Sequence, residues 1–271
     1  YTNLQNASDA NGRDFLEWYL DQAKAAEAGG GKLIDYLDLH WYPEAKGGNT
    51  RITGTETDAA VVTAREQAPR SLWDATYDED SWIHDSLNGP ITLVPRMLKK
   101  IADHDPGTKL SFTEWNYGGG GHISGAIASA DVLGVFGREG VSLACLWELN
   151  SDESFSYAAL RAYRNFDGQG GQFGDTSILA TTSDVTDVSV YASTQSTAAD
   201  GVRLVAINKA TTGKSVSIKL WHGSTFSHFN VYQLAGTSAA FSKQSDQPSV
   251  AKNAWKLTLP AQSVSVLVPV Q

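Results

Sequence analysis

Carboxylate, imidazole, phenol and indole side chains stand where three short apolar segments of the sequence end. Glu114 ends the apolar run that begins at Lys109, His40 and Tyr42 end an earlier run, and Trp147 ends a later one. Side chains alternate between the two faces of a strand, so His40 and Tyr42 share one face. If the three runs are parallel strands, their carboxyl ends meet and bring the four side chains into one small space.

Glu114 is the sharpest single candidate. It follows an apolar run and precedes the glycine loop 118–121, which would let a bulky ligand approach the backbone. The alternative is a glutamate that caps a helix or forms a surface ion pair, as most charged side chains do. Taken alone, His40 is more typical of a hydrogen-bonded core histidine, and Tyr42 and Trp147 are more typical of core residues than of ligand platforms.

Composition excludes several other classes of protein. The 271 residues carry 21 Lys and Arg against 30 Asp and Glu, a net charge of −9, which leaves no basic stripe for nucleic acid or an anionic membrane. The single cysteine, Cys145, excludes an internal disulfide and a multi-cysteine metal site. Four acidic residues are candidate calcium ligands but lack the spacing of an EF-hand: Asp152, Glu153, Asp184 and Asp187. We therefore expect no cofactor, and a structural calcium ion is the one alternative left open.

The elements that position these residues change character along the chain. Up to residue 166, helices alternate with short strands, as is typical of a parallel α/β sheet or barrel. The pattern predicts helices over 12–28, 56–68, 90–104, 123–138 and 157–166, an aromatic loop over 70–86, and strands over 32–42, 109–114 and 141–147. The first strand is expected to be buried on both faces.

Beyond Gly168 the pattern becomes one of short period-two strands separated by Ser, Thr, Asn, Asp and Gly, which is typical of an antiparallel sandwich. We therefore predict an α/β domain over residues 1–175 and a β-sandwich domain over 176–271. A closed (β/α)8 barrel takes eight strands and about 250 residues, whereas this domain offers three. It is either an open α/β sheet or the back part of a barrel, and the polar opening at Tyr1 reads as the middle of a longer protein.

Five separated segments, taken together and in this order, resemble glycoside hydrolase family 44. They are LIDYLDLHWYP (33–43), RSLWDATY (70–77), PRMLKKIADHDPGTKLSFTEWNYGG (95–119), ADVLGVFGREG (130–140) and YRNFDGQGGQFGDTS (163–177). The resemblance implies a (β/α)8 barrel with an attached β-sandwich, and a retaining endo-acting β-1,4-glucanase that often cleaves xyloglucan. By this resemblance the three strands are the sixth, seventh and eighth of the barrel, so truncation of the chain explains why only three of the eight strands are found.

The resemblance also implies roles for residues. Glu114 falls on the nucleophile of the family motif T-E-[WY]-N, while the acid/base Glu follows an Asn on the fourth strand, a segment that this chain lacks. Retaining hydrolysis needs both carboxyl groups, about 5 to 5.5 Å apart. The family usually has Gly where this chain has Glu148. We assign catalysis to Glu114, no residue to a metal, and substrate binding to His40, Tyr42, Trp115, Tyr117, Trp147 and Trp73.

Our main hypothesis is the C-terminal part of a retaining endo-β-1,4-glucanase acting on cellulose- or xyloglucan-type glucans. Its expected partners are the polysaccharide and the missing N-terminal half of the same protein, for which a separate bound polypeptide is one alternative, with no nucleic acid or membrane involved. The isolated chain is expected to be nearly inactive, because a sugar alkoxide leaves poorly unless protonated. A polymeric substrate implies secretion. The alternative is a non-catalytic carbohydrate-binding protein that uses the sandwich and the loop aromatics Trp73, Tyr77 and Trp82.

Overall fold

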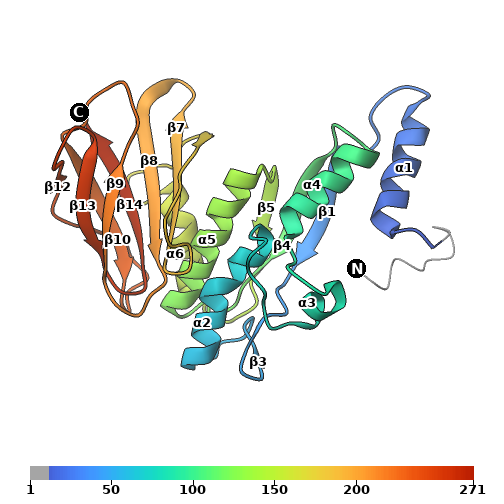
Figure 1. The fold of residues 1–271 in the computed structure, drawn as a ribbon, viewed down its shortest axis with the longest axis horizontal. Coiled ribbons are helices and arrows are strands. Elements are labelled where there is room, and N and C mark those ends of the chain that lie inside the picture. The colour runs from blue at the N-terminus through green and yellow to red at the C-terminus, as the bar shows by residue number, and fades with distance from the viewer. Residues whose placement is uncertain (1–11) are drawn as a thin grey trace.

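The computed structural model describes residues 12–271, which form two packed units (Figure 1). In the first unit, β1 (Tyr36–Trp41), β4 (Lys109–Trp115) and β5 (Leu143–Leu146) form a parallel sheet in that order. Its helices are α1 (Phe15–Glu27), α2 (Ala59–Gln67), α3 (Trp82–Leu87), α4 (Leu93–His104), α5 (Ile123–Glu139) and α6 (Ser154–Arg164). A hairpin of β2 (Lys46–Gly47) and β3 (Thr50–Arg51) and a 3₁₀ helix η3 (Ala68–Leu72) complete it.

The helices begin and end where the sequence supplies caps. The Asp14 carboxylate accepts the N–H groups of Leu16 and Glu17 at 3.0 and 3.2 Å, which satisfies two free donors at the start of α1. α5 ends at Gly140, whose φ of +82° is a left-handed conformation that glycine adopts without steric cost. α5 therefore stops just before the chain enters β5.

The second unit consists of two antiparallel sheets. The larger sheet has seven strands in the order β11-β10-β14-β8-β7-β6, with β12 also paired to β10, and the smaller sheet pairs β13 with β9. Their bounds are β6 (Thr176–Ile178), β7 (Val188–Gln195), β8 (Ala198–Asn208), β9 (Lys214–Lys219), β10 (His228–Ala235), β11 (Ser242–Lys243), β12 (Gln247–Pro248), β13 (Ala254–Leu259) and β14 (Ser263–Val270). Phe229 stacks on Trp255 at 4.0 Å between ring centroids, in the core between the two sheets.

Helices α5 and α6 pack against the larger sheet, as Figure 1 shows. Period-two alternation in β8 sends Val205 and Ile207 into the core shared with these helices, and Leu204 into the core shared with β13. The approach of α5 is close, because a Cβ at Gly134 would lie 2.2 Å from the ring of Tyr191. One hydrophobic core therefore continues from the parallel sheet through α5 into the antiparallel sheet.

The predicted strands and helices of the first unit are confirmed, with shorter bounds at most ends. The expectation that the first strand is buried on both faces is wrong. Leu37 and Trp41 are buried, while Asp38 and His40 on the other face are exposed. The loop predicted over 70–86 contains the end of η3 and most of α3. No helix within residues 12–271 is long and apolar enough to cross a membrane.

Candidate active site

A β-bulge in β4 decides where the Glu114 side chain points. Leu39 pairs with Phe112 and His40 with Glu114, so Thr113 has no partner residue in β1. Regular alternation would place Phe112 and Glu114 on one face. Phe112 stacks on Phe136 of α5 at 5.1 Å, whereas Glu114 contacts His40 on the opposite side of the sheet. The extra residue has therefore turned Glu114 away from the helices, which is a common use of a bulge beside an active site.

Glu114 meets His40 and Tyr42 through one carboxylate oxygen. The Tyr42 hydroxyl donates to Glu114 Oε2 at 2.8 Å, and His40 Nδ1 lies 3.2 Å from the same oxygen. The Glu114 side chain is 28% exposed, so it remains open to a ligand. The predicted convergence of Glu114, His40 and Tyr42 is confirmed.

Tyr42 stays protonated and keeps its donor role. Burial, together with the hydrogen bond to the Glu114 carboxylate and its negative charge, raises the pKa of Tyr42 to about 12. Arg51 holds the backbone of this segment, because its Nε donates to the carbonyl of Pro43 at 3.0 Å and its Nη2 to the carbonyl of Tyr42 at 3.2 Å. The phenol is thus fixed both by its own backbone and by Glu114.

Asp38 lies on the same face as His40 and binds β4. It accepts hydrogen bonds from Ser111 Oγ at 2.6 Å, from the Thr113 N–H at 3.1 Å and from Thr113 Oγ1. Burial disfavours the charged form of Asp38, but the hydrogen bonds from Ser111 and Thr113 outweigh it and hold the pKa below its ordinary value. Asp38 is therefore an anion under ordinary conditions.

Trp147 is an exposed indole at the carboxyl end of β5. Its backbone N–H donates to the carbonyl of Trp115 at 3.1 Å, which places it beside the residue that follows Glu114, and its side chain is 53% exposed. An exposed indole can stack on the apolar face of a ligand. The neighbouring Glu148 carboxylate accepts a hydrogen bond from the Tyr157 hydroxyl.

Two buried residues that the sequence analysis did not assign to the site hold the loop of Trp147. Asn116 donates from Nδ2 to the carbonyl of Trp147 at 2.6 Å and to Glu153 Oε1 at 3.2 Å. Glu153 Oε1 also accepts the N–H groups of Leu149 and Asn150, both at 3.0 Å. Position in the motif TEWN could have indicated Asn116, but no pattern signals Glu153.

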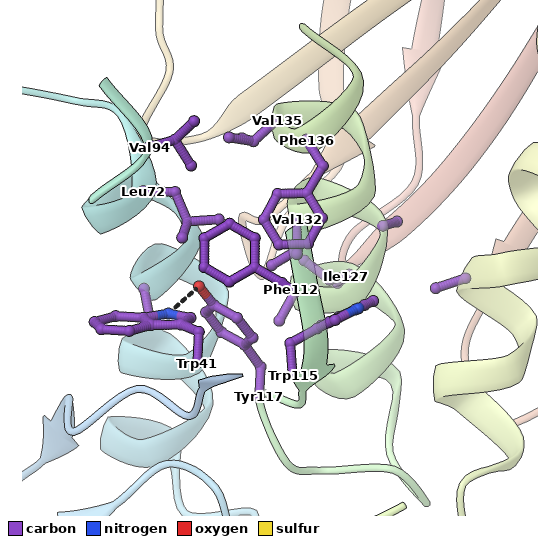
Figure 2. Packing of buried hydrophobic residues seen from close by; sticks show 14 of the residues in the cluster. Trp41, Leu72, Val94, Phe112, Trp115, Tyr117, Ile127, Val132, Val135 and Phe136 are labelled. Carbon is purple, nitrogen blue, oxygen red and sulfur yellow. Dashed lines mark hydrogen bonds between the residues drawn. The ribbon is translucent and has the colours of Figure 1, made fainter. Parts of the chain in front are cut away.

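Three predicted substrate-binding residues do not line this site. Trp115 and Tyr117 are 1% and 0% exposed, and Figure 2 shows both among the packed core residues, with Trp41 Nε1 donating to the Tyr117 hydroxyl at 3.0 Å. The bulge accounts for Trp115, because it turns this side chain toward Phe136 on the helix side. The prediction of substrate contact by Trp115 and Tyr117 is therefore wrong.

Trp73 lies at the other end of the sheet. Its ring is 4.0 Å from the guanidinium of Arg138, in the last turn of α5. The N–H of Ser142, four residues later, donates to the carbonyl of Leu110 near the start of β4. Arg138 and Trp73 are therefore near the amino ends of the strands, away from Glu114, and the prediction of substrate contact by Trp73 is also wrong.

The acidic residues left open for calcium have other partners. Glu153 binds the loop of Trp147, and the Asp187 carboxylate pairs with Lys214 Nζ. Among the side chains that the structure describes, those of residues 12–198 and 201–271, no group of three or more His, Cys, Asp or Glu is arranged to hold a metal ion.

Comparison with known proteins leads to the same family as the sequence motifs. The model of glycoside hydrolase family 44 matches residues 1–45. The chain is 38% identical to endoglucanase A of Paenibacillus lautus, over 99% of this chain and 39% of that protein. A family 44 endoglucanase structure from Clostridium acetobutylicum aligns with TM-score 0.92 and 40% identity, over 97% of this chain and 52% of that one. A Paenibacillus polymyxa family 44 xyloglucanase aligns with TM-score 0.92 and 36% identity, over 98% and 54%.

These matches cover nearly the whole of this chain and about half of each solved relative. The resemblance inferred from the sequence motifs is thereby confirmed: the chain matches enzymes of glycoside hydrolase family 44 and corresponds to about half of such an enzyme.

Proposed function

We propose that this chain supplies the nucleophile, Glu114, of a retaining endo-β-1,4-glucanase that acts on cellulose- or xyloglucan-type glucans. The observation that carries the proposal is the partly exposed Glu114 carboxylate at the end of a parallel strand, whose Oε2 accepts from the Tyr42 hydroxyl and lies 3.2 Å from His40 Nδ1. Relatives named endoglucanase and xyloglucanase support the substrate class.

The proposed reaction is a double displacement. Among the described residues no hydrogen bond reaches Glu114 Oε1, so this oxygen is free to attack the anomeric carbon. Attack forms a glycosyl ester and breaks the glycosidic bond, while an acid gives its proton to the leaving oxygen. The same group then takes a proton from water, whose oxygen attacks the anomeric carbon and releases Glu114. Tyr42 and His40 fix the carboxylate, and Trp147 offers its ring to the sugar.

The acid/base residue is proposed to lie in the half of the enzyme that this chain does not cover. In the part of the chain that the structure describes, β1 and β5 each have a partner strand on one side only, and an unpaired strand edge favours addition of a further strand. In the proposal β1, β4 and β5 are three strands of a (β/α)8 barrel that the other half completes, either in the same polypeptide or as a bound fragment. Residues 1–175 are then proposed to belong to the barrel and 176–271 to the sandwich. The proposal also includes a location outside the cell, because a polymeric substrate cannot enter one.

The test isolates the nucleophile from the acid. A 2-deoxy-2-fluoro cellobioside with a dinitrophenyl leaving group needs no proton for departure and leaves a stable glycosyl ester. Denaturing mass spectrometry before and after incubation should show one added fluorocellobiosyl group on the chain and on Glu148→Gln, the matched control beside Trp147. Glu114→Gln should gain none. An adduct that forms on Glu148, or that persists in Glu114→Gln, would refute the assignment.

A non-catalytic, glycan-binding function is the second candidate. The observation in its favour is that Trp147 and, on the sandwich, Trp221 are 53% and 87% exposed. Calorimetry with xyloglucan oligosaccharides separates the two functions. Binding that is equal in the unchanged chain and in Glu114→Gln, with no adduct in either, favours the binding protein.

A further inference from the structure

The bulge in β4 leaves one backbone donor outside the ladder of the parallel sheet. Thr113 has no partner residue in β1, and the acceptor for its N–H is a side chain instead. Asp38 Oδ1 supplies it at 3.1 Å. The same carboxylate accepts the hydroxyl groups of Ser111, at 2.6 Å, and of Thr113, so three donors of β4 converge on Asp38.

The residue that follows this contact points to the same side of the sheet as Asp38. Ser111, Thr113 and Glu114 all face Asp38, His40 and Tyr42, although regular alternation would send Glu114 to the helix side. A shift of one residue in a strand exchanges its two faces. Without the bulge, Glu114 would point toward α5, where Phe112 stacks on Phe136.

We propose that Asp38 is a positioning residue, which locks the bulge at Thr113 and thereby holds Glu114 against Tyr42 and His40. Its carboxylate is engaged by β4, so Asp38 itself takes no part in bond making or proton transfer. The consequence for catalysis rests on the proposed role of Glu114, whereas the structural consequence can be measured without it.

Variants of Asp38 separate the loss of its hydrogen-bond acceptor from the loss of its negative charge. Asp38→Leu is similar in size and has no acceptor, and Asp38→Ala removes the acceptor by truncation. Asp38→Asn keeps one carbonyl oxygen for the Thr113 N–H. Ser111→Ala is the matched control, because it removes one donor to the same carboxylate and leaves the Thr113 contact in place.

The first readout is amide hydrogen exchange by NMR, which needs no activity. In the unchanged chain the Thr113 amide should be protected. In Asp38→Leu and Asp38→Ala its exchange should be faster by about tenfold or more, the equivalent of one lost hydrogen bond to a charged group. The ladder amides of Leu110 and Phe112 should change much less. A Thr113 amide that exchanges freely in the unchanged chain overturns the proposal even if no variant folds.

The second readout is labelling of Glu114 by the fluorinated cellobioside. For Asp38→Leu, the limiting rate constant should fall about tenfold or more, while the concentration giving half the limiting rate stays within threefold. Asp38→Asn and Ser111→Ala should label nearly as fast as the unchanged chain. Unaltered labelling in Asp38→Leu refutes the proposal. If the unchanged chain is not labelled at all, the proposed function fails, and amide exchange still decides the role of Asp38.

Discussion

Glu66, on the last turn of α2, is a carboxyl group buried where the parallel unit meets the antiparallel sheet, with 3% of its surface exposed. Burial raises its pKa to about 7. The hydrogen bond from Gln262 Nε2, at 2.8 Å, and the positive charges of Lys209 and Arg65 oppose this shift only in part. Lys209 is itself engaged by Asp131, with 3.4 Å between Nζ and Oδ2.

A raised pKa makes the protein less stable at high pH. The ordinary pKa of 4.5 applies to the unfolded chain, so between pH 4.5 and about 7 the folded chain binds the proton more tightly. The free energy of unfolding therefore falls as pH rises through this window, and this contribution is constant above it. The difference in pKa corresponds to about 3 kcal/mol, at about 1.4 kcal/mol per unit.

Glu66→Gln should remove this dependence, because a glutamine carbonyl can still accept from Gln262 and carries no charge. At pH 8 the variant is expected to be more stable than the unchanged chain by about 3 kcal/mol, which corresponds to a Tm higher by roughly 6 °C or more. At pH 4 the two should unfold at nearly the same temperature.

Scanning calorimetry from pH 4 to 8 measures this difference. Asp85→Asn, which changes a carboxyl group with an 81% exposed side chain, is the control and should follow the unchanged chain. The reasoning fails if Glu66→Gln is equally or less stable at pH 8, since the carboxylate would then be adequately solvated or paired in the folded state.

Three further predictions concern the residues that frame the site. Trp115→Ala should lower the free energy of unfolding by about 3 to 5 kcal/mol and Trp147→Ala by less than about 1, by urea titration, because only the first indole fills the core. Gly118→Ala should lower the free energy of unfolding by more than about 1 kcal/mol, because the φ of Gly118 is +74° and a Cβ there would lie 2.4 Å from neighbouring backbone. Gly137→Ala, on the open surface of α5, is the control and should be neutral or stabilising. Arg65→Met should cost about 3 kcal/mol or more in the same titration, since the buried guanidinium binds backbone carbonyls at 2.8 to 3.2 Å that would lose their donors.

The helices and strands could be predicted from the sequence, and so could the end of the sheet at which the reactive side chains gather. Runs such as 109–114 are apolar enough to mark a strand, and the carboxyl ends of parallel strands meet whatever their side chains are. His40 and Tyr42 followed from the period of two, because β1 keeps regular alternation up to Trp41. These inferences depend only on local pattern and on the geometry of parallel strands.

The direction of each side chain beyond Phe112 depends on the pairing of β4 with β1, which is not local. A single unpaired residue, Thr113, exchanges the faces of all that follow, so Glu114 joins the open side and Trp115 the core. The assignment of Trp115 and Tyr117 to the substrate rested on their place beside Glu114 in the motif, and closeness in sequence does not tell on which face of the strand a side chain lies. The acceptor that compensates the bulge is 75 positions away in the chain, at Asp38. Because a side-chain acceptor can take a backbone donor that the ladder leaves out, a polar side chain on the neighbouring strand is the feature by which such a bulge can be sought in other sequences.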